Sequence, residues 1–332
     1  MSGFWNDRRV LVTGATGLIG SWLVKALLER EARVVALVQD ADPQSELYRS
    51  GAIERVAVVQ GALEDFWALE RAINTHDVEA VFHLGAQTLV GAAHRSPLPT
   101  FEANIRGTYH VLEACRLHGG LVRRVVIASS DKAYGEPPRL PYDETFPLHG
   151  RHPYEVSKSC ADLLAQAYHH TYALPVAIAR CGNVYGGGDL HWSRIVPGTI
   201  RALLGGERPV IRSDGTFVRD YLYVKDAVLA YLQLAERLEE RSVAGEAFNF
   251  SAEQPMTVRA MVQAIQRVLR ATHLEPQVLN QATGELRSQY LSAAKARQLL
   301  SWAPAVDLET GLEETIAWYR AYLAGAPVAQ VR

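Results

Sequence analysis

The 332-residue sequence lacks several features that mark special classes of protein. Its three cysteines, Cys115, Cys160 and Cys181, are odd in number and show no CxxC spacing, which predicts reduced thiols rather than a disulfide framework. The eleven histidines are scattered without a metal-ligand spacing, so we expect no metal site. No apolar run approaches the roughly 20 residues that span a bilayer, and the N-terminal segment carries no signal-peptide core. These absences predict a cytoplasmic protein that does not enter a membrane.

An excess of charge of one sign is also lacking. The formal net charge is −2, and no stretch concentrates lysine and arginine as a nucleic-acid-binding surface would. Hydrophobic residues make up 48% and charged residues 21% of the chain, a balance typical of globular proteins. A chain of this length accommodates one large domain and a smaller one. We therefore expect a globular protein with no nucleic-acid partner.

Short apolar runs alternate with amphipathic segments through the first half of the chain. The apolar runs, expected to be strands, cover 8–14, 32–38, 53–61, 78–86, 123–129 and 174–180, and helical spacing is found over 21–31, 66–76, 104–119 and 154–172. The runs are continuous in Val, Ile and Leu rather than alternating with polar residues, as expected for strands covered on both faces. The sequence therefore predicts an α/β fold with a doubly wound parallel sheet.

Three glycines, Gly14, Gly17 and Gly20, stand between the first strand and the first helix in "VTGATGLIGSWL". Without side chains, such a turn lets backbone N–H groups approach a pyrophosphate at the positive end of the helix, so the pattern indicates a dinucleotide cofactor. At the end of the second strand, Val38 fills the position where an acidic residue usually binds the ribose, and Asp40 follows two residues later. No lysine or arginine stands there to bind a 2′-phosphate, so we expect NAD rather than NADP.

Two further motifs carry groups suited to acid–base chemistry. Tyr154 and Lys158 are four residues apart at a helix start, so they share one face, and the ammonium is expected to lower the pKa of the phenol toward neutrality. Such a tyrosine can take a hydroxyl proton while hydride leaves the same carbon. Upstream, the apolar run 125–128 stops at Ser129-Ser130-Asp131-Lys132, a polar cluster that a buried strand does not need.

Together these motifs resemble the extended short-chain dehydrogenase/reductase family of nucleotide-sugar epimerases and dehydratases. The resemblance covers nearly the whole chain and extends to "HLGAQ" (83–87), "NIRGT" (104–108), "RCGNVYGGGD" (180–189), "VRDYLYVKD" (218–226) and "GELRSQYLSAAKARQLLSW" (284–302). Within the family, "SSDKAYG", "SKSCADL" and "GNVYGGGDLHWSRIVP" look most like the CDP-glucose 4,6-dehydratases. The resemblance implies a modified Rossmann domain over 1–182, with 217–251 packing back onto it. It also implies a smaller α+β domain for the nucleotide sugar over 183–216 and 252–332, with helices at 256–271 and 293–300.

The resemblance also implies roles for individual residues. Ser130, Asp131, Lys132, Tyr154 and Lys158 are expected to be catalytic. The expected NAD-binding residues are Gly14, Thr16, Gly17, Leu18, Ile19, Gly20, Asp40, Leu63, Leu84, Ala86, Gln87, Asn104, Ser129, Tyr154, Lys158 and Cys181. The expected substrate-binding residues are Gln87, Ser130, Asn183, Arg194, Val196, Arg219 and Arg287, with the two last arginines on the diphosphate. Each of those arginines could instead serve a surface ion pair, such as one between Arg219 and Asp220.

Asp131 and Lys132 bear on which reaction is catalysed. A 4-epimerase needs only the serine, tyrosine and lysine, whereas a 4,6-dehydratase must also remove the C5 proton and protonate the C6 hydroxyl so that water leaves. We therefore expect a dehydratase, with a 4-epimerase and a non-catalytic NAD-binding protein as the alternatives. Because adjacent Asp131 favours the charged form of Lys132, the identity of the C5 base stays open.

The family resemblance further implies a homodimer formed through the helices at 104–118 and 154–172. Leu164 and Tyr168 on the second of these helices could pack across that interface or into the core, and the sequence leaves both possibilities open.

Overall fold

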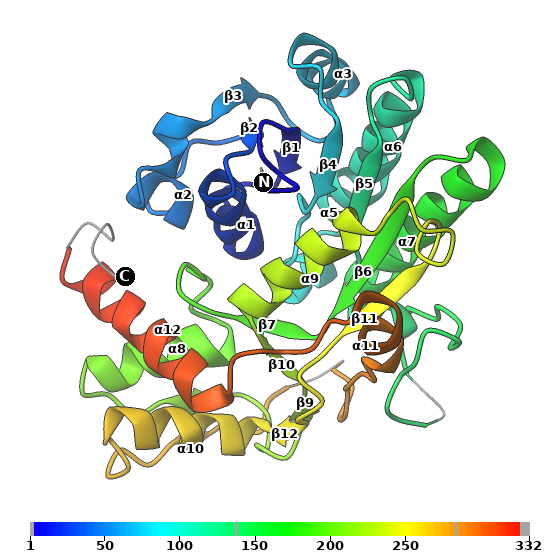
Figure 1. Ribbon diagram of the computed structural model, residues 1–332. Coiled ribbons are helices and arrows are strands. Elements are labelled where there is room, and N and C mark those ends of the chain that lie inside the picture. The colour runs from blue at the N-terminus through cyan, green and yellow to red at the C-terminus, as the bar shows by residue number, and fades with distance from the viewer. Residues whose placement is uncertain (1–2, 137–138, 283–284, 326–332) are drawn as a thin grey trace.

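Within residues 3–136, 139–282 and 285–325, which the computed structural model describes, seven parallel strands form a central sheet (Figure 1). Its order is β11-β6-β5-β4-β1-β2-β3. The strands are β1 (Arg9–Thr13), β2 (Arg33–Val38), β3 (Ala57–Gln60), β4 (Ala80–His83), β5 (Arg124–Ala128), β6 (Val176–Cys181) and β11 (Ala247–Phe250). Because the chain grows one way from β1 to β3 and the other way from β4 onward, a crevice opens at the carboxyl ends of β1 and β4.

Both faces of the sheet are covered by helices, which confirms the predicted doubly wound fold. Along β1, Val10 and Val12 face one core cluster and Leu11 faces the other, so each strand buries residues on both sides. The first cluster is closed by α1 (Leu18–Glu29), α9 (Val224–Glu236) and α11 (Ala294–Leu300). The second is closed by α3 (Phe66–Thr75), α6 (Gly107–Leu117) and α7 (Pro153–Tyr172).

A second layer lies beyond the carboxyl ends of the strands and has its own core (Figure 1). It consists of α8 (Ile195–Leu204), α10 (Val258–Leu269) and α12 (Leu308–Leu323), and of the strand pairs β7 (Asn183–Tyr185) with β10 (Tyr221–Tyr223), β9 (Val218–Arg219) with β12 (Met256–Thr257), and β8 (Val210–Ile211) with β13 (Gln277–Val278). From the segment 217–251, α9 and β11 pack onto the sheet, and so does α11 from the segment 252–332. The predicted domain boundaries stay a prediction.

Several predicted elements begin elsewhere for local reasons. The strand expected from residue 53 begins at Ala57, because η1 (Ala52–Arg55) follows a left-handed turn at Gly51. The helix expected over 256–271 begins at Val258, where the Thr257 side chain caps it. The helix expected from 104 continues from a π-helical turn, η2 (Glu102–Arg106), into α6. The remaining short helices are α2 (Glu46–Arg49), α4 (Val90–Arg95), α5 (Pro97–Phe101) and η3 (Asp131–Tyr134).

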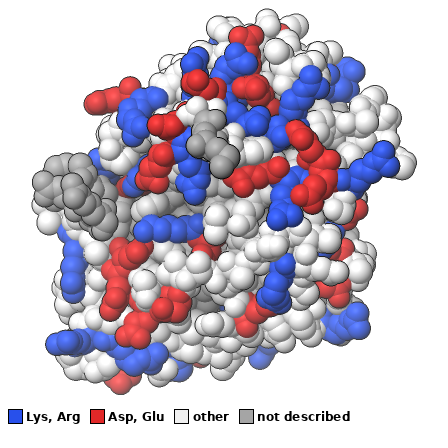
Figure 2. Space-filling model, in the orientation of Figure 1, with Lys and Arg blue, Asp and Glu red and all other residues white. Residues whose placement is uncertain are grey.

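The surface shows no strong charge segregation on the face drawn in Figure 2, where acidic and basic side chains intermingle. Among the described residues, no helix is both long and apolar enough to cross a membrane. In the same part of the chain, no group of three or more His, Cys, Asp or Glu side chains is arranged to hold a metal ion.

Candidate active site

A cavity of about 1820 Å³ opens between the carboxyl ends of the strands and the second layer. The glycine loop, the loops after β4 and β5, the start of α7 and the segment 181–219 all contribute to its lining. A typical small-molecule pocket has a volume of roughly 300–1,000 Å³. The cavity is therefore large enough for a dinucleotide and a second ligand side by side.

The glycine loop is shaped for close backbone contacts. Gly14 has φ +69°, and a Cβ there would lie 2.6 Å from Gly85 N. A Cβ on Gly20 would lie 2.0 Å from the carbonyl oxygen of Gly14. Gly17 caps α1 without a side-chain hydrogen bond, and the first turn has no acidic residue, so the helix N-terminus is free to bind an anion. This loop fits the pyrophosphate of a dinucleotide.

The cavity is acidic at the end where the second strand stops. Val38 is buried in the core, while Asp40, Asp42 and Glu64 line the cavity. From Gly14 to Glu64 no lysine or arginine lines it. A 2′-phosphate would meet only repulsion from these carboxylates, so the lining fits NAD better than NADP.

Ser129, Ser130, Asp131 and Lys132 line the cavity at the tip of β5. Ser130 Oγ donates to Asp131 Oδ1 at 2.9 Å, and Lys132 Nζ lies 3.5 Å from the same oxygen. Among the described residues, the buried Asp131 Oδ2 and Ser129 Oγ have no hydrogen-bond partner. Because buried polar atoms are almost always paired, these two atoms are available to a ligand that enters the cavity.

Tyr154 and Lys158 reach the same cavity from the first turns of α7. Burial raises the pKa of Tyr154 to about 12, whereas the positive charge of Arg194 and a hydrogen bond between the Tyr154 and Ser130 hydroxyls act to lower it. Burial lowers the pKa of Lys158 to about 8, and its Nζ donates to the carbonyl oxygen of Ala128 at 2.8 Å. The predicted fall in the pKa of Tyr154 caused by Lys158 is therefore wrong for this structure, in which burial dominates.

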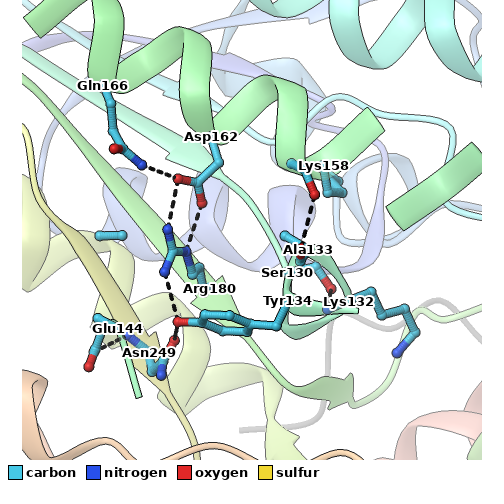
Figure 3. Close-up of polar contacts among 12 residues, drawn as sticks. Ser130, Lys132, Ala133, Tyr134, Glu144, Lys158, Asp162, Gln166, Arg180 and Asn249 are labelled. Carbon is cyan, nitrogen blue, oxygen red and sulfur yellow. Dashed lines mark hydrogen bonds and ion pairs between the residues drawn. The ribbon is translucent and has the colours of Figure 1, made fainter. Parts of the chain in front are cut away.

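A buried polar network holds the β5 tip from behind (Figure 3). Arg180 on β6 forms two hydrogen bonds with Asp162 on α7, at 2.7 and 2.9 Å, and donates to the Tyr134 hydroxyl at 2.7 Å. Tyr134, at the end of η3, donates in turn to Asn249 Oδ1 at 2.8 Å. Because both charges are buried and fully hydrogen-bonded, removing one partner would leave the other uncompensated. The network thus fixes η3 relative to α7 and the sheet.

The predicted substrate residues Asn183, Arg194, Val196 and Arg219 line the second-layer side of the cavity. Arg194 donates to Asp189 Oδ2 at 3.0 Å and to Thr88 Oγ1 at 2.9 Å, which joins the two walls. Arg219 forms an ion pair with Glu285 at 3.1 Å, not with Asp220.

Two predicted site residues do not line the cavity. Asn104 is buried, and its amide is hydrogen-bonded to the backbone of Gln87 and to Ser157. Arg287 is exposed, and its carbonyl oxygen accepts hydrogen bonds from Val218 N and from Arg219. Gln87 does line the cavity, although its own amide is folded onto Leu89. The other predicted residues line it, and their roles stay predictions.

The sequence interpretation missed several cavity residues, most of them on or around α8 and β10 and one in the loop after β4. They include Thr88, Asp189, His191, Trp192, Arg201, Arg208, Arg212, Phe217 and Tyr221. The available signal was the density of arginine and aromatic residues over 191–221, next to the glycine-rich segment.

Three features define an extended short-chain dehydrogenase. They are this sheet order, a glycine loop at the first strand-to-helix turn, and a serine, a tyrosine and a lysine in one cavity. Residues 11–315 match the family described as GDP-mannose 4,6 dehydratase, and the chain belongs to that family. A curated relative, the CDP-glucose 4,6-dehydratase of Salmonella typhimurium, is 31% identical over 97% of this chain and 93% of its own length.

Solved structures of both dehydratases and epimerases are similar to this chain. The UDP-glucose 4-epimerase of Thermotoga maritima with UDP-glucose is 30% identical, with a TM-score of 0.86 over 95% of this chain and 99% of its own. A dTDP-glucose 4,6-dehydratase of Streptomyces venezuelae with NAD bound is 28% identical, also with a TM-score of 0.86, over 97% and 100%. The predicted family and fold are therefore confirmed, and the NAD held by the latter relative agrees with the predicted cofactor. The choice between dehydratase and epimerase is not made by these similarities.

Proposed function

We propose that the chain is an NAD-dependent nucleotide-sugar 4,6-dehydratase that converts CDP-glucose into CDP-4-keto-6-deoxyglucose. The observation that carries the proposal is Asp131, a buried carboxylate with one unpartnered oxygen at the cavity wall, beside Ser130 and Lys132. An epimerase has no use for an additional acid at this place, whereas elimination of water does. The 31% identity to a CDP-glucose 4,6-dehydratase supports the choice of nucleotide.

The first half of the reaction is assigned to Ser130 and Tyr154. Both side chains line the cavity, and Ser130 is close enough to Tyr154 to lower its pKa, so a sugar 4-hydroxyl bound at this place would lie within reach of both. Tyr154 removes the proton, and the positive charge of Arg194 stabilises its phenolate. Bound NAD supplies the reversible oxidation at C4, and Lys158 is positioned to hold its ribose.

The second half is assigned to the tip of β5. The 4-ketone acidifies the C5 proton, and Lys132, which points into the same cavity, is the candidate base. Asp131 in its acid form donates a proton to the C6 hydroxyl through Oδ2, and water leaves. Asn183 Oδ1 lies 3.5 Å from Lys132 Nζ and orients that amine. One proton leaves C5 and one joins the departing hydroxyl, which leaves a double bond between C5 and C6. Return of the hydride from bound NAD to C6 and of a proton to C5 would complete CDP-4-keto-6-deoxyglucose and restore the oxidised cofactor, so atoms and electrons balance.

A panel of nucleotide sugars tests the proposal directly. The purified protein is incubated with CDP-, dTDP-, GDP- and UDP-hexoses, and products are read by mass spectrometry. Loss of one water from the CDP sugar supports the proposal, and loss from another sugar alone would keep the dehydratase and change the nucleotide. An isomer of unchanged mass would favour the 4-epimerase. A protein that binds NAD but converts no sugar would be the non-catalytic alternative.

A homodimer through α6 and α7 is part of the proposal. Tyr109 and Leu117 on α6 and Leu163 and Tyr172 on α7 are 37%, 54%, 54% and 56% exposed, an apolar surface of the kind that marks protein contacts. Leu164 and Tyr168, in contrast, pack against the core of the same chain. The double variant Leu163→Lys/Tyr172→Lys should sediment as a monomer, and a monomeric wild-type protein would refute this part.

A further inference from the structure

His83 is a buried histidine that the proposed chemistry does not use. It ends β4, directly before the loop of Leu84 to Thr88 that lines the cavity. Its Nδ1 lies 2.8 Å from Thr13 Oγ1 and its Nε2 lies 3.1 Å from Thr108 Oγ1. Thr13 ends β1 immediately before the glycine loop, and Thr108 belongs to the first turn of α6.

The direction of each hydrogen bond between Thr13, His83 and Thr108 follows from the groups at the two ends of this series, a backbone carbonyl and a backbone N–H. Thr108 Oγ1 donates to the carbonyl oxygen of Asn104 at 2.6 Å, and a carbonyl can only accept. Thr108 must therefore accept from His83, which places the proton on Nε2 and leaves Nδ1 as an acceptor for the Thr13 hydroxyl. Gly85 N–H, which can only donate, supplies the remaining bond to Thr13 Oγ1 at 3.1 Å. Only the neutral Nε2–H tautomer of His83 gives the hydroxyl protons of both Thr13 and Thr108 an acceptor.

The series of hydrogen bonds continues through Asn104 to α7, the helix that carries Tyr154 and Lys158. Asn104 Nδ2 donates to Gln87 O at 3.0 Å and to Ser157 Oγ at 2.9 Å, and its Oδ1 accepts from Gln87 N at 2.7 Å. Ser157 Oγ donates to the carbonyl oxygen of Tyr154 at 2.7 Å. These hydrogen bonds, linked through the backbone and side chain of Asn104, thus join the glycine-loop strand, the cavity loop after β4 and the first turn of α7.

We propose that His83, fixed as the Nε2–H tautomer, is a positioning residue that sets the spacing between the cofactor loops and Tyr154. The expected effect of this spacing on kcat rests on the proposed function. The tautomer of His83 and its effect on NAD binding do not. The pKa of His83 is lowered to about 3, first by burial and then by the charge of Lys158, so the ring stays neutral at physiological pH.

Nuclear magnetic resonance of the wild-type protein with ¹⁵N-labelled histidine tests the tautomer without any activity. The His83 signals, identified by their loss in His83→Gln, should show a protonated Nε2 and a bare Nδ1. They should not titrate between about pH 5 and about pH 8, where ordinary histidines do. A protonated Nδ1, or a titration midpoint in that range, would overturn the proposal.

Thr108→Val tests the positioning while keeping the size of the side chain. It removes the acceptor of His83 Nε2–H, and NAD should bind more weakly while kcat falls about 10- to 100-fold, the range expected for a small misplacement of reacting groups. The sugar KM should change less than kcat, because neither Thr108 nor His83 lines the cavity. Thr100→Val is the matched control, since Thr100 is a buried threonine whose hydroxyl has no partner among the described residues.

The outcomes separate the two proposals. If Thr108→Val has normal NAD affinity and kcat and only a lower melting temperature, the series of hydrogen bonds has a purely structural role. That result would overturn the proposed positioning role of His83. The same loss in Thr100→Val would also overturn it. If the wild-type protein binds NAD but dehydrates no sugar, the proposed function fails while the tautomer and the NAD affinities still decide the role of His83.

Discussion

Asp131→Asn is the substitution that best separates a dehydratase from an epimerase. An asparagine keeps the size of the side chain, and its carbonyl oxygen can still accept from Ser130, as Asp131 Oδ1 does at 2.9 Å. Its amide nitrogen takes the place of Oδ2, the oxygen with no partner among the described residues. The ion pair to Lys132 is lost, but its 3.5 Å separation is long and Lys132 is 22% exposed, so water can solvate the ammonium that remains. The variant should therefore fold normally.

The effect on the reaction should be large and confined to one half of it. Loss of a general acid slows a step by about 10²–10⁴-fold, or about 3–5 kcal/mol of activation free energy. The oxidation at C4 uses Ser130, Tyr154 and Lys158, and it should persist. The two halves of the reaction should therefore respond differently, since elimination slows while oxidation at C4 continues.

The assay follows both halves in deuterated water. Mass spectrometry reports loss of water from the sugar, and stopped-flow absorbance of the nicotinamide reports the oxidation at C4 and its pH dependence. Asp143→Asn is the matched control, because that partly exposed carboxylate lies outside the cavity and accepts hydrogen bonds from Thr145 in a turn. A variant that dehydrates its sugar at the wild-type rate would show that Asp131 takes no part in catalysis, and the epimerase would become the better proposal.

Three other predictions concern single residues. Tyr154→Phe should lower kcat by about 10²–10⁴-fold, measured by turnover of the sugar; a normal rate would contradict its role as the base. Gly20→Ala should weaken NAD binding about tenfold or more, because its Cβ would lie 2.0 Å from Gly14 O; unchanged affinity would exclude the glycine loop as the NAD site. Burial raises the pKa of Asp220 from 3.8 to about 6, so its contribution to folding stability is present below about pH 4 and is lost as pH rises through about 6. Asp220→Asn should therefore stabilise the protein at pH 7 by at most about 3 kcal/mol and have little effect near pH 4, as measured by urea unfolding; equal effects at both pH values would contradict the assignment.

The part of the site that could be predicted from the sequence is the part that topology determines. In a parallel sheet, residues that follow strands meet at one edge, so Gly14, Gln87 and Ser130 could be placed together from the apolar runs that precede them. The fold class followed from the same continuous runs. The helical spacing of Tyr154 and Lys158 likewise placed both on the cavity side of one helix.

What could not be predicted depends on contacts between distant segments. The pKa of Tyr154 depends on its burial and on Arg194, forty residues further along the chain, rather than on the neighbouring lysine. Arg219 contacts Glu285 rather than its sequence neighbour, and only the folded chain brings that pair together. Asn104 was expected at the cofactor, but its amide holds the loop at Gln87 instead. In each case the local sequence contains the residue but not its partner.

The position of α7 bears on where specificity can arise in this fold. One side of the helix is held by Asn104 through Ser157, and the other by Arg180 through Asp162, and all of these side chains are buried. A shift of α7 would leave buried polar groups unpaired at about 1–3 kcal/mol each, so Tyr154 and its helix cannot easily be moved to suit another reaction. The β5 tip and the second layer carry the side chains that can vary without breaking this network. The difference between elimination and epimerisation should therefore be sought in residues such as Asp131 and Lys132, and nucleotide preference in the arginine-rich wall over 191–221.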